Sequence, residues 1–218
     1  MLNITRLYNS VCSVGQMTRT LQQLRDYSSK RHVFGALLDN QVLHYSTFAA
    51  EKVKALAGFL LTMELAHLVG KEECGKASPS ESALVRLLTP VTKLFTARSS
   101  VQVASEVIEG FGGAGYIEDT GVAVHLRDAQ VFPIWEGATN VLSLDLLRVL
   151  QNPAAMQALS DAICEKLRGV QDPEVKPFCT RLTEGILKRF VAEFEVFEKQ
   201  SDEVRMASSR DLAFFLAR

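Results

Sequence analysis

The sequence predicts an all-α fold, in which long helices pack side by side as a bundle. Apolar residues recur at intervals of three and four along most of the chain, which places them on one face of a helix. No segment shows a convincing alternation of apolar and polar residues, the pattern of a half-buried strand. With 218 residues, 47% of them hydrophobic, the chain is long enough to bury a substantial core.

Two long helices are predicted at the start. The first covers Ile4 to Tyr27 and is followed by a basic run and then Gly35, which suits a helix C-terminus and a turn. The second, about Val42 to Val69, is apolar around more of its circumference than the first. A helix of that kind should lie at the centre of a bundle.

A third long helix follows the polar link from Lys71 to Pro79 and runs to Phe111. We expect Ser80 or Ser82 to cap its N-terminus. Pro90 should bend or restart it, because proline removes one backbone donor and clashes with the preceding turn.

Shorter helices are predicted after the glycine-rich turn that begins at Gly112. We expect two of them, at Thr120 to Asp128 and at Thr139 to Leu150, separated by an apolar turn. Pro153 marks a boundary, so the prediction divides the chain into a helical bundle over residues 1–151 and an added helical subdomain over residues 152–218. Its helices are expected at Ala154 to Arg168, Glu174 to about Lys199, and Val204 to Leu216.

The composition argues against several classes of partner. Acidic and basic residues nearly cancel, 25 against 24, so nothing drives the chain toward nucleic acid or an anionic membrane, and we expect neither as a partner. No apolar run approaches the roughly 20 residues that span a bilayer. The four cysteines lack zinc spacing, which predicts no metal site and reduced, mostly buried thiols in an intracellular protein.

Arg31 and Phe34 place a cation and an aromatic ring at the end of the first predicted helix. Such residues most often complement the helix dipole and pack a loop, and less often bind a ligand. The pair Gly112 and Gly113 lets a backbone come close to a ligand phosphate, although glycines that merely end a helix are commoner. Pattern alone leaves both interpretations open at both places.

Glu136 lies between bulky apolar residues and a flexible glycine, in the run from Pro133 to Gly137. Burial in such surroundings raises the pKa of a carboxyl group and makes it suitable as a general base. The alternative is a glutamate whose charge meets the dipole at the start of the helix that begins at Thr139.

Together these segments resemble the acyl-CoA dehydrogenase family, in matching order and spacing from Leu2 to about Leu150. Five motifs carry the resemblance, in register on helices of the right lengths. They are Asn3-Ile4-Thr5-Arg6, Arg31-His32-Val33-Phe34-Gly35, Glu106 to Tyr116, Arg127-Asp128-Ala129, and Ile134 to Asn140. The resemblance implies the helical bundle of that family's C-terminal domain.

The resemblance implies a catalytic role for Glu136. In this family the glutamate of the I-[YW]-E-G motif removes the α-proton of a fatty acyl-CoA thioester, while a β-hydrogen leaves as hydride to FAD. Glu136 occupies its place, and Thr5 offers no alternative acidic base near Arg6. The implied function is therefore that of a flavoprotein oxidoreductase in fatty acid metabolism.

The resemblance also implies where cofactor and substrate lie. Arg31 and Phe34 would meet the pyrophosphate and adenosine parts of FAD across a subunit interface, which implies a homodimer or a dimer of dimers. Arg6 and Gly137 would lie on the substrate side of the pocket. The other residues implied to contact FAD are Glu109, Gly112, Gly113, Thr139 and Asn140.

The sequence departs from the common family pattern near the expected cofactor. Glu109 stands where many members carry glutamine, which puts an acid near the adenosine and pyrophosphate. Val33 replaces a frequent hydroxyl residue, and Val42 replaces a frequent glutamine, with Gln41 one residue earlier. Trp135 and the helical extension resemble the branch that contains the bacterial alkylation-response flavoprotein. The extension has too little basic clustering to indicate DNA binding.

Family members carry an N-terminal helical domain and a middle β-domain ahead of the helix that begins here at Ile4. We therefore expect the C-terminal part of a longer enzyme, inactive alone, with weak or no FAD binding and an exposed apolar face on its first helices. Family analogy implies electron-transfer flavoprotein or oxygen as electron acceptor. It also implies a mitochondrial or peroxisomal location in a eukaryote, and the cytoplasm otherwise.

Two other hypotheses remain open. The first is a non-catalytic homologue that binds flavin, acyl-CoA or nucleic acid. The second is a helical interaction module without a cofactor, for which a change at Arg31 would leave the flavin affinity of the full-length protein unchanged.

Overall fold

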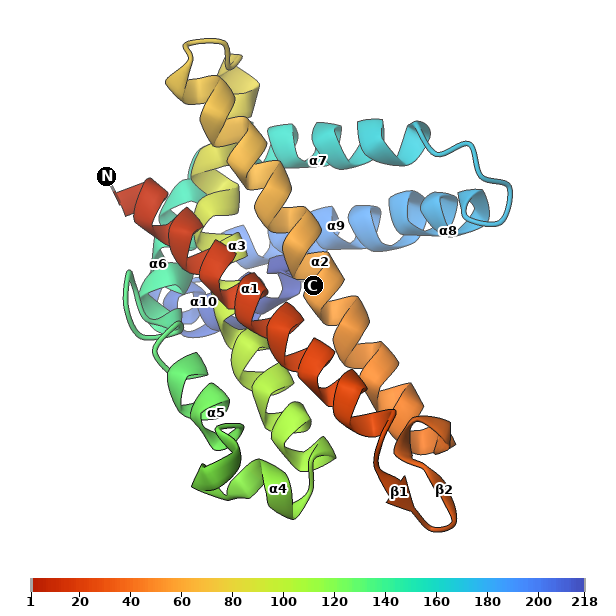
Figure 1. Ribbon diagram of the computed structural model, residues 1–218. Coiled ribbons are helices and arrows are strands. Elements are labelled where there is room, and N and C mark those ends of the chain that lie inside the picture. Colours follow the sequence, from red (N-terminus) through yellow and green to blue (C-terminus); the bar gives the residue numbers. More distant parts are fainter. Residues whose placement is uncertain (1, 218) are drawn as a thin grey trace.

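The fold is all-α, as predicted, with a bundle of long helices and a helical extension beside it (Figure 1). This computed structural model describes the backbone of residues 2–217 and the side chains of residues 3–185 and 188–217. Three long helices, which pack against one another, form the bundle. They are α1 (Leu2–Ser28), α2 (Val42–Glu73) and α3 (Pro79–Gly110).

The central helix of the bundle is α3, and the prediction that α2 would be central is wrong. α3 packs against α1, α2, α6, α7 and α10, and it is buried almost continuously from Leu84 to Ser100. It continues through Pro90 without restarting. α2 is apolar on two sides, but only one of them is covered by α1 and α3.

α3 begins earlier than predicted, because Ser78 rather than Ser80 or Ser82 is its N-cap. The Ser78 hydroxyl accepts a hydrogen bond from the backbone N–H of Glu81 at 3.2 Å. The Glu81 carboxylate in turn accepts one from the backbone N–H of Ser78 at 2.8 Å. This reciprocal capping box satisfies two backbone donors at the start of the helix.

The first half of α1 turns a polar side to the core. Three apolar residues of this half, Ile4, Tyr8 and Val11, are 53%, 60% and 45% exposed. In the second half the apolar residues that recur at helical spacing are buried, namely Val14, Met17, Leu21 and Leu24. The residues that face the core before Val14 share small or hydrogen-bonding side chains: Arg6, Asn9, Ser10 and Ser13.

A two-stranded hairpin that the sequence analysis missed follows α1. β1 (His32–Val33) pairs antiparallel with β2 (Ala36–Leu37), and η1 (Leu38–Asn40) leads into α2. Phe34 and Gly35 at the tip have φ values of 50° and 81°, as in two-residue turns with both central residues left-handed. Strands of two residues are too short to show an alternating pattern.

Short elements follow the glycine-rich turn and lead to the segment that carries Glu136. The α6 helix has the predicted bounds, and the helix before it begins three residues later than predicted. Gly112 ends α3 with a φ of 61°, a conformation that favours glycine. The elements are α4 (Gly113–Tyr116), η2 (Glu118–Thr120), α5 (Ala123–Ala129) and α6 (Thr139–Leu150).

Replacing Gly115 by alanine is expected to destabilise the domain by about 1–3 kcal/mol, the usual cost of overpacking. A Cβ at this position would lie 2.1 Å from the backbone oxygen of Ile108, which cannot move without distorting α3. Gly113→Ala is the matched control, because nothing lies within 4 Å of a Cβ added there. Urea unfolding followed by circular dichroism measures both variants, and equal losses in the two would contradict this account of the packing.

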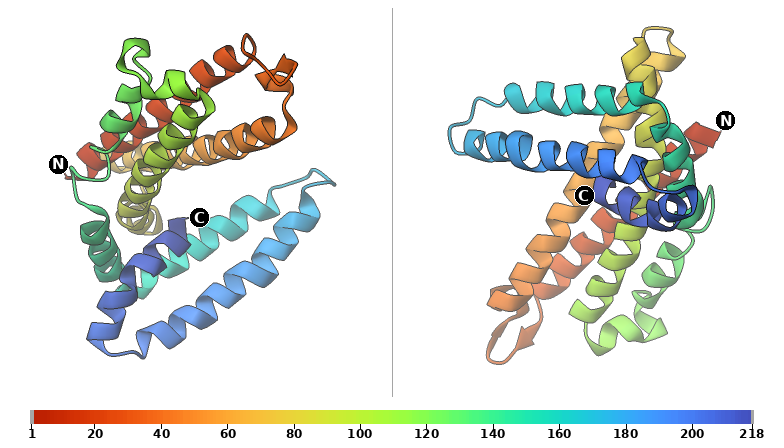
Figure 2. Two further views of the ribbon diagram at one scale, coloured as in Figure 1. Left: turned by 90° about the horizontal axis from the view of Figure 1, so that it is seen from below. Right: turned by 180° about the vertical axis from the view of Figure 1, so that it is seen from behind.

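The extension forms a hairpin of helices that projects from the bundle, and its last helix returns to pack against α6 and α3 (Figure 2). A salt bridge of 3.0 Å from Lys166 to Glu64 joins α7 to α2. The elements are α7 (Pro153–Arg168), α8 (Lys176–Arg181), the π-helical segment η3 (Leu182–Leu187), α9 (Lys188–Glu198) and α10 (Asp202–Ala217).

One face of α1 and α2 is apolar and exposed, as expected for the first helices of the bundle. On α2 it includes Val53, Leu56 and Leu60, each more than half exposed. The sequence analysis found no apolar run long enough to span a bilayer, but by length and composition alone α2 is apolar enough to cross a membrane. Within the chain, 33% of its most apolar window is buried.

All four cysteines are free thiols, as expected, but the prediction that most of them are buried is wrong. Only Cys179 is buried, Cys74 is exposed, and Cys12 and Cys164 are half-buried. Cys74 follows the last residue of α2, at a helix end that faces solvent.

Candidate active site

Glu136 lies in a hydrogen-bonded turn between α5 and α6, in a backbone conformation that non-glycine residues rarely adopt. Its φ is +58°, and Gly137 after it has a φ of +106°. A non-glycine residue in the left-handed region typically costs about 1–3 kcal/mol, and such strain clusters at functional sites. The surrounding structure must therefore hold this turn.

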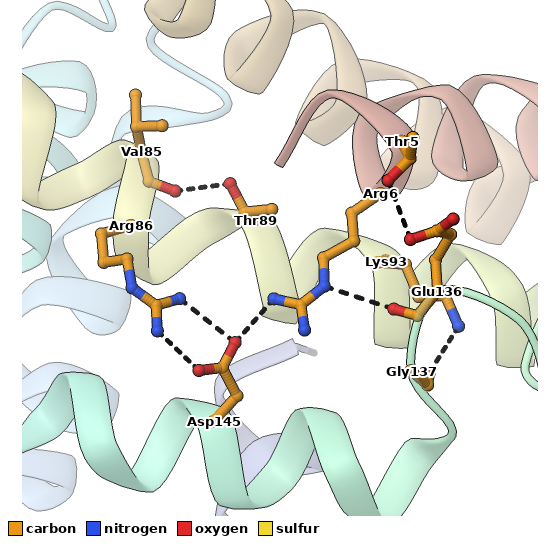
Figure 3. Close-up of polar contacts among 9 residues, drawn as sticks. All are labelled: Thr5, Arg6, Val85, Arg86, Thr89, Lys93, Glu136, Gly137 and Asp145. Atoms are coloured by element: carbon orange, nitrogen blue, oxygen red, sulfur yellow. Dashed lines mark hydrogen bonds and ion pairs between the residues drawn. The ribbon is translucent and has the colours of Figure 1, made fainter. Parts of the chain in front are cut away.

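Three side chains from the long helices bind backbone carbonyl groups of the turn. Asn9 of α1 donates to the carbonyl oxygen of Phe132 at 3.1 Å, and Arg6 donates through Nε to that of Glu136 at 3.3 Å. Lys93 of α3 donates through Nζ to the carbonyl oxygen of Gly137 at 2.7 Å (Figure 3). These bonds fix the backbone on both sides of the Glu136 side chain.

The carboxylate of Glu136 is held as well. The hydroxyl of Thr5 donates to Glu136 Oε2 at 2.8 Å, so α1 contacts both the side chain and the backbone of this residue. Glu136 is half-buried, whereas Ile134 and Trp135 beside it are 65% and 40% exposed. The apolar enclosure expected around Glu136 is therefore only partial within this chain.

Arg6, predicted on the substrate side, is 3% exposed and its guanidinium is occupied. Arg6 Nη1 donates to Asp145 Oδ2 of α6 at 2.6 Å, and Arg86 of α3 binds both oxygens of the same carboxylate, at 2.5 and 3.1 Å. Hydrogen bonds from Arg86, and then from Arg6, lower the pKa of Asp145 to about 2 against the opposing effect of burial. This cluster joins α1, α3 and α6 directly behind the turn.

Lys93 is a fully buried cation in the middle of α3. Burial, followed by the positive charge of Arg6, lowers its pKa to about 8, and the negative charge of Glu136 opposes that change. The ammonium group thus lies within electrostatic reach of the candidate base.

A second group of predicted residues lines a hollow of about 430 Å³ at the other end of α1. Arg31, Glu109, Gly112 and Gly113 all border it, although they come from three separate segments. The Arg31 side chain is exposed and has no ion-pair partner among residues 2–217. Phe34 lines the adjoining hollow, of about 420 Å³, which Glu109 also borders, and its side chain is 99% exposed.

Thr139 and Asn140 lie away from that hollow, at the N-terminus of α6 beside the Glu136 turn. Figures 1 and 2 show the start of α6 and the β1–β2 hairpin on different sides of the bundle. Thr139 is buried, and the exposed Asn140 accepts a hydrogen bond through Oδ1 from Arg210 of α10 at 2.6 Å. The predicted site residues thus form two groups within one chain.

The sequence analysis missed Asn9, Arg86, Lys93 and Asp145. A signal for one of them was present, because Arg6, Asn9, Ser10 and Ser13 recur at helical spacing beside the apolar stripe of α1. The contributions of α3 and α6 depend on contacts between residues far apart in the chain, which no local pattern reveals.

Comparisons with known proteins identify relatives of this chain. The family model "Acyl-CoA dehydrogenase, C-terminal domain" matches residues 1–151. Acyl-CoA dehydrogenase family member 11 of Caenorhabditis elegans is 43% identical over 227 residues, covering 100% of this chain and 36% of the relative. AidB of Escherichia coli strain K12 is 30% identical over 163 residues, covering 74% of this chain and 29% of the relative.

A solved structure has the same fold as this chain. The crystal structure of Caenorhabditis elegans ACDH-11 in complex with C11-CoA matches with a TM-score of 0.93 and 40% identity, over 100% of this chain and 37% of that chain. The chain thus spans about a third of the length of these relatives. The AidB match agrees with the predicted branch. The chain belongs to the acyl-CoA dehydrogenase family, through its C-terminal helical domain.

Proposed function

We propose that the full-length protein is an FAD-dependent acyl-CoA dehydrogenase in which Glu136 is the general base. The observation that carries the proposal is the left-handed turn at Glu136, held by Thr5, Arg6 and Lys93. A carboxylate held by Thr5, on a turn fixed by side chains from α1 and α3, is suited to removing a proton from a defined carbon.

The proposed reaction forms a double bond between C2 and C3 of an acyl-CoA thioester. Glu136 takes the proton from C2, and the electron pair of that C–H bond becomes the second bond between C2 and C3. FAD, when bound, accepts the hydride that leaves C3, because no side chain can do so. The Thr5 hydroxyl donates to Oε2, which leaves Oε1 of Glu136 as the oxygen to receive the proton.

The chain offers groups suited to the phosphate end of FAD. Arg31 supplies an exposed cation, and the turn at Gly112 and Gly113 exposes backbone in the same hollow. Glu109 borders that hollow too and would weaken binding of a phosphate. Because this group and the Thr139–Asn140 group lie on different sides of one chain, we propose that two chains share each FAD in a homodimer or a dimer of dimers.

The substrate class follows from the same proposal. The solved structure of ACDH-11 holds C11-CoA, which supports a fatty acyl-CoA as substrate here. Electron-transfer flavoprotein or oxygen would then reoxidise the flavin, in the mitochondrion or peroxisome of a eukaryote or in the cytoplasm otherwise. The 218-residue chain alone should be inactive, since it spans about a third of the length of its relatives.

The full-length protein is expected to be yellow, and its flavin absorption band should bleach when a fatty acyl-CoA is added without oxygen. A series of acyl-CoA esters of increasing chain length identifies the substrate, and mass spectrometry of the 2-enoyl product confirms the reaction. The 218-residue chain, measured in parallel, should bind little FAD. Its flavin absorption should not change when acyl-CoA is added. A full-length protein that holds FAD but is bleached by no acyl-CoA would contradict the proposal.

A further inference from the structure

We propose that Lys93 is a positioning residue for Glu136, which it acts on through the carbonyl group of Gly137. The inference rests on the proposed function, because it assigns a role in presenting the proposed base. Among the described residues, Lys93 Nζ donates its hydrogen bond to the carbonyl oxygen of Gly137, one residue after Glu136, at 2.7 Å.

The burial of Lys93 argues for a specific role. Lys93 is 0% exposed and lies in the middle of the central helix α3. Within the described residues, the carbonyl oxygen of Gly137 is the hydrogen-bond partner of its ammonium group, and no carboxylate forms an ion pair with it. A buried charge without an ion-pair partner is unfavourable, and a methionine of similar length would remove that cost. A lysine at position 93 is therefore expected to make the fold less stable than a methionine would.

The geometry shows what Lys93 does for the turn. The peptide between Glu136 and Gly137 joins two residues with positive φ, a conformation that the chain would not hold unaided. Arg6 donates to the carbonyl oxygen of Glu136, in the peptide that joins these two residues. Lys93 donates to the carbonyl oxygen of Gly137, in the peptide after it. Arg6 is held by Asp145, which Arg86 of α3 also binds, whereas Lys93 is buried in the middle of α3. Side chains from α1 and α3 thus hold the turn together.

Lys93 also sets the charge beside the base. The charged groups that act on it are Arg6 from α1 and Glu136 from the turn, while Asp145 of α6 is held by Arg6 and Arg86. The turn that carries the base therefore has a cation beside it, and Lys93→Met removes that cation.

The test compares Lys93→Met, Lys93→Arg and the control Thr89→Val in the full-length flavoprotein. The Thr89 hydroxyl lies one turn away on α3, is fully buried and bonds only the carbonyl oxygen of Val85 in its own helix (Figure 3). Hydrogen–deuterium exchange of the amides in residues 131–138 measures the order of the turn. Rates of flavin reduction over a range of acyl-CoA concentrations separate the effect on kcat from the effect on KM.

We expect K93M to speed amide exchange in residues 131–138 and to lower kcat by about 10²-fold, as small displacements of a catalytic group do, with a smaller change in KM. K93R should recover part of kcat, because it restores a cation that can donate to the carbonyl group of Gly137. T89V should leave amide exchange in the turn and kcat unchanged.

Two results would overturn the role of Lys93: a folded K93M whose turn exchanges no faster than in the unchanged protein, or a T89V with the same loss of kcat as K93M. Lys93→Gln keeps a hydrogen-bond donor but removes the charge. It is measured alongside and replaces K93M in the comparison if K93M does not fold. If none of the acyl-CoA esters reduces the flavin of the unchanged protein, the proposed function fails. Amide exchange then decides the role of Lys93 by itself.

Discussion

Glu136→Gln is expected to lower the rate of flavin reduction by acyl-CoA in the full-length protein by about 10²–10⁴-fold, the usual contribution of a general base. Glutamine keeps the shape of the side chain and can still accept the hydrogen bond from Thr5 that holds Glu136 at 2.8 Å. It cannot take the proton from C2 of the thioester. Stopped-flow absorbance of the flavin band, without oxygen, measures the rate directly.

The affinity for acyl-CoA separates catalysis from binding in this experiment. E136Q should bind the thioester nearly as well as the unchanged protein, because the substitution removes a charge and leaves the turn in place. Glu118→Gln is the matched control, since the exposed Glu118 carboxylate forms one ion pair among the described residues, with the equally exposed Arg127 at 3.5 Å. An E136Q protein that reduces its flavin at the unchanged rate would show that Glu136 is not the base.

Asp145→Asn is expected to destabilise the helical domain by about 3 kcal/mol, because it leaves the buried guanidinium of Arg6 without a countercharge. For a domain of this size, that loss lowers Tm by roughly 6–12 °C. Scanning calorimetry measures it. Asp161→Asn on α7 is the control, because its exposed carboxylate accepts a single hydrogen bond from Gln157 within the same helix.

The effect of Asp145 should also depend on pH in a defined direction. Its folded-state pKa is lowered from 3.8 to about 2, so its stabilising effect is complete above about pH 4 and is lost as pH falls through 2. The pH-dependent part is worth about 2 kcal/mol. The difference in unfolding free energy between D145N and the unchanged protein should therefore shrink between pH 4 and pH 2. A difference that stays constant over this range would contradict the assignment of this charge.

Local sequence pattern was sufficient for the helices because each is long and its signals lie within a few residues. Thr139–Leu150 was predicted at its observed bounds, since an apolar face and the proline after Asn152 define both ends. The capping box at Ser78 was missed although Glu81 stands three residues later, because two other serines nearby offered alternative caps. The central place of α3 was missed because burial depends on which faces meet other helices.

The site was predictable only in part, for a physical reason. Motif resemblance pointed to Glu136 and to the residues around Arg31, which the structure brings together in one hollow with Gly112 and Gly113. It could not reveal Lys93 or Asp145, because their roles arise from packing between helices separated by tens of residues in the chain. It also gave Arg6 a substrate-side role, whereas the structure shows its guanidinium engaged with Asp145 and the Glu136 backbone.

The central claim is that the carboxylate of Glu136, fixed in its left-handed turn, faces the reacting carbon of an acyl-CoA. A crystal structure of the full-length protein with FAD and a non-reactive acyl-CoA analogue tests it most directly. The account predicts a Glu136 oxygen within about 3–3.5 Å of C2 of the thioester, with the flavin ring on the opposite side of the acyl chain. A Glu136 side chain turned into solvent, with C2 bound elsewhere, would contradict it.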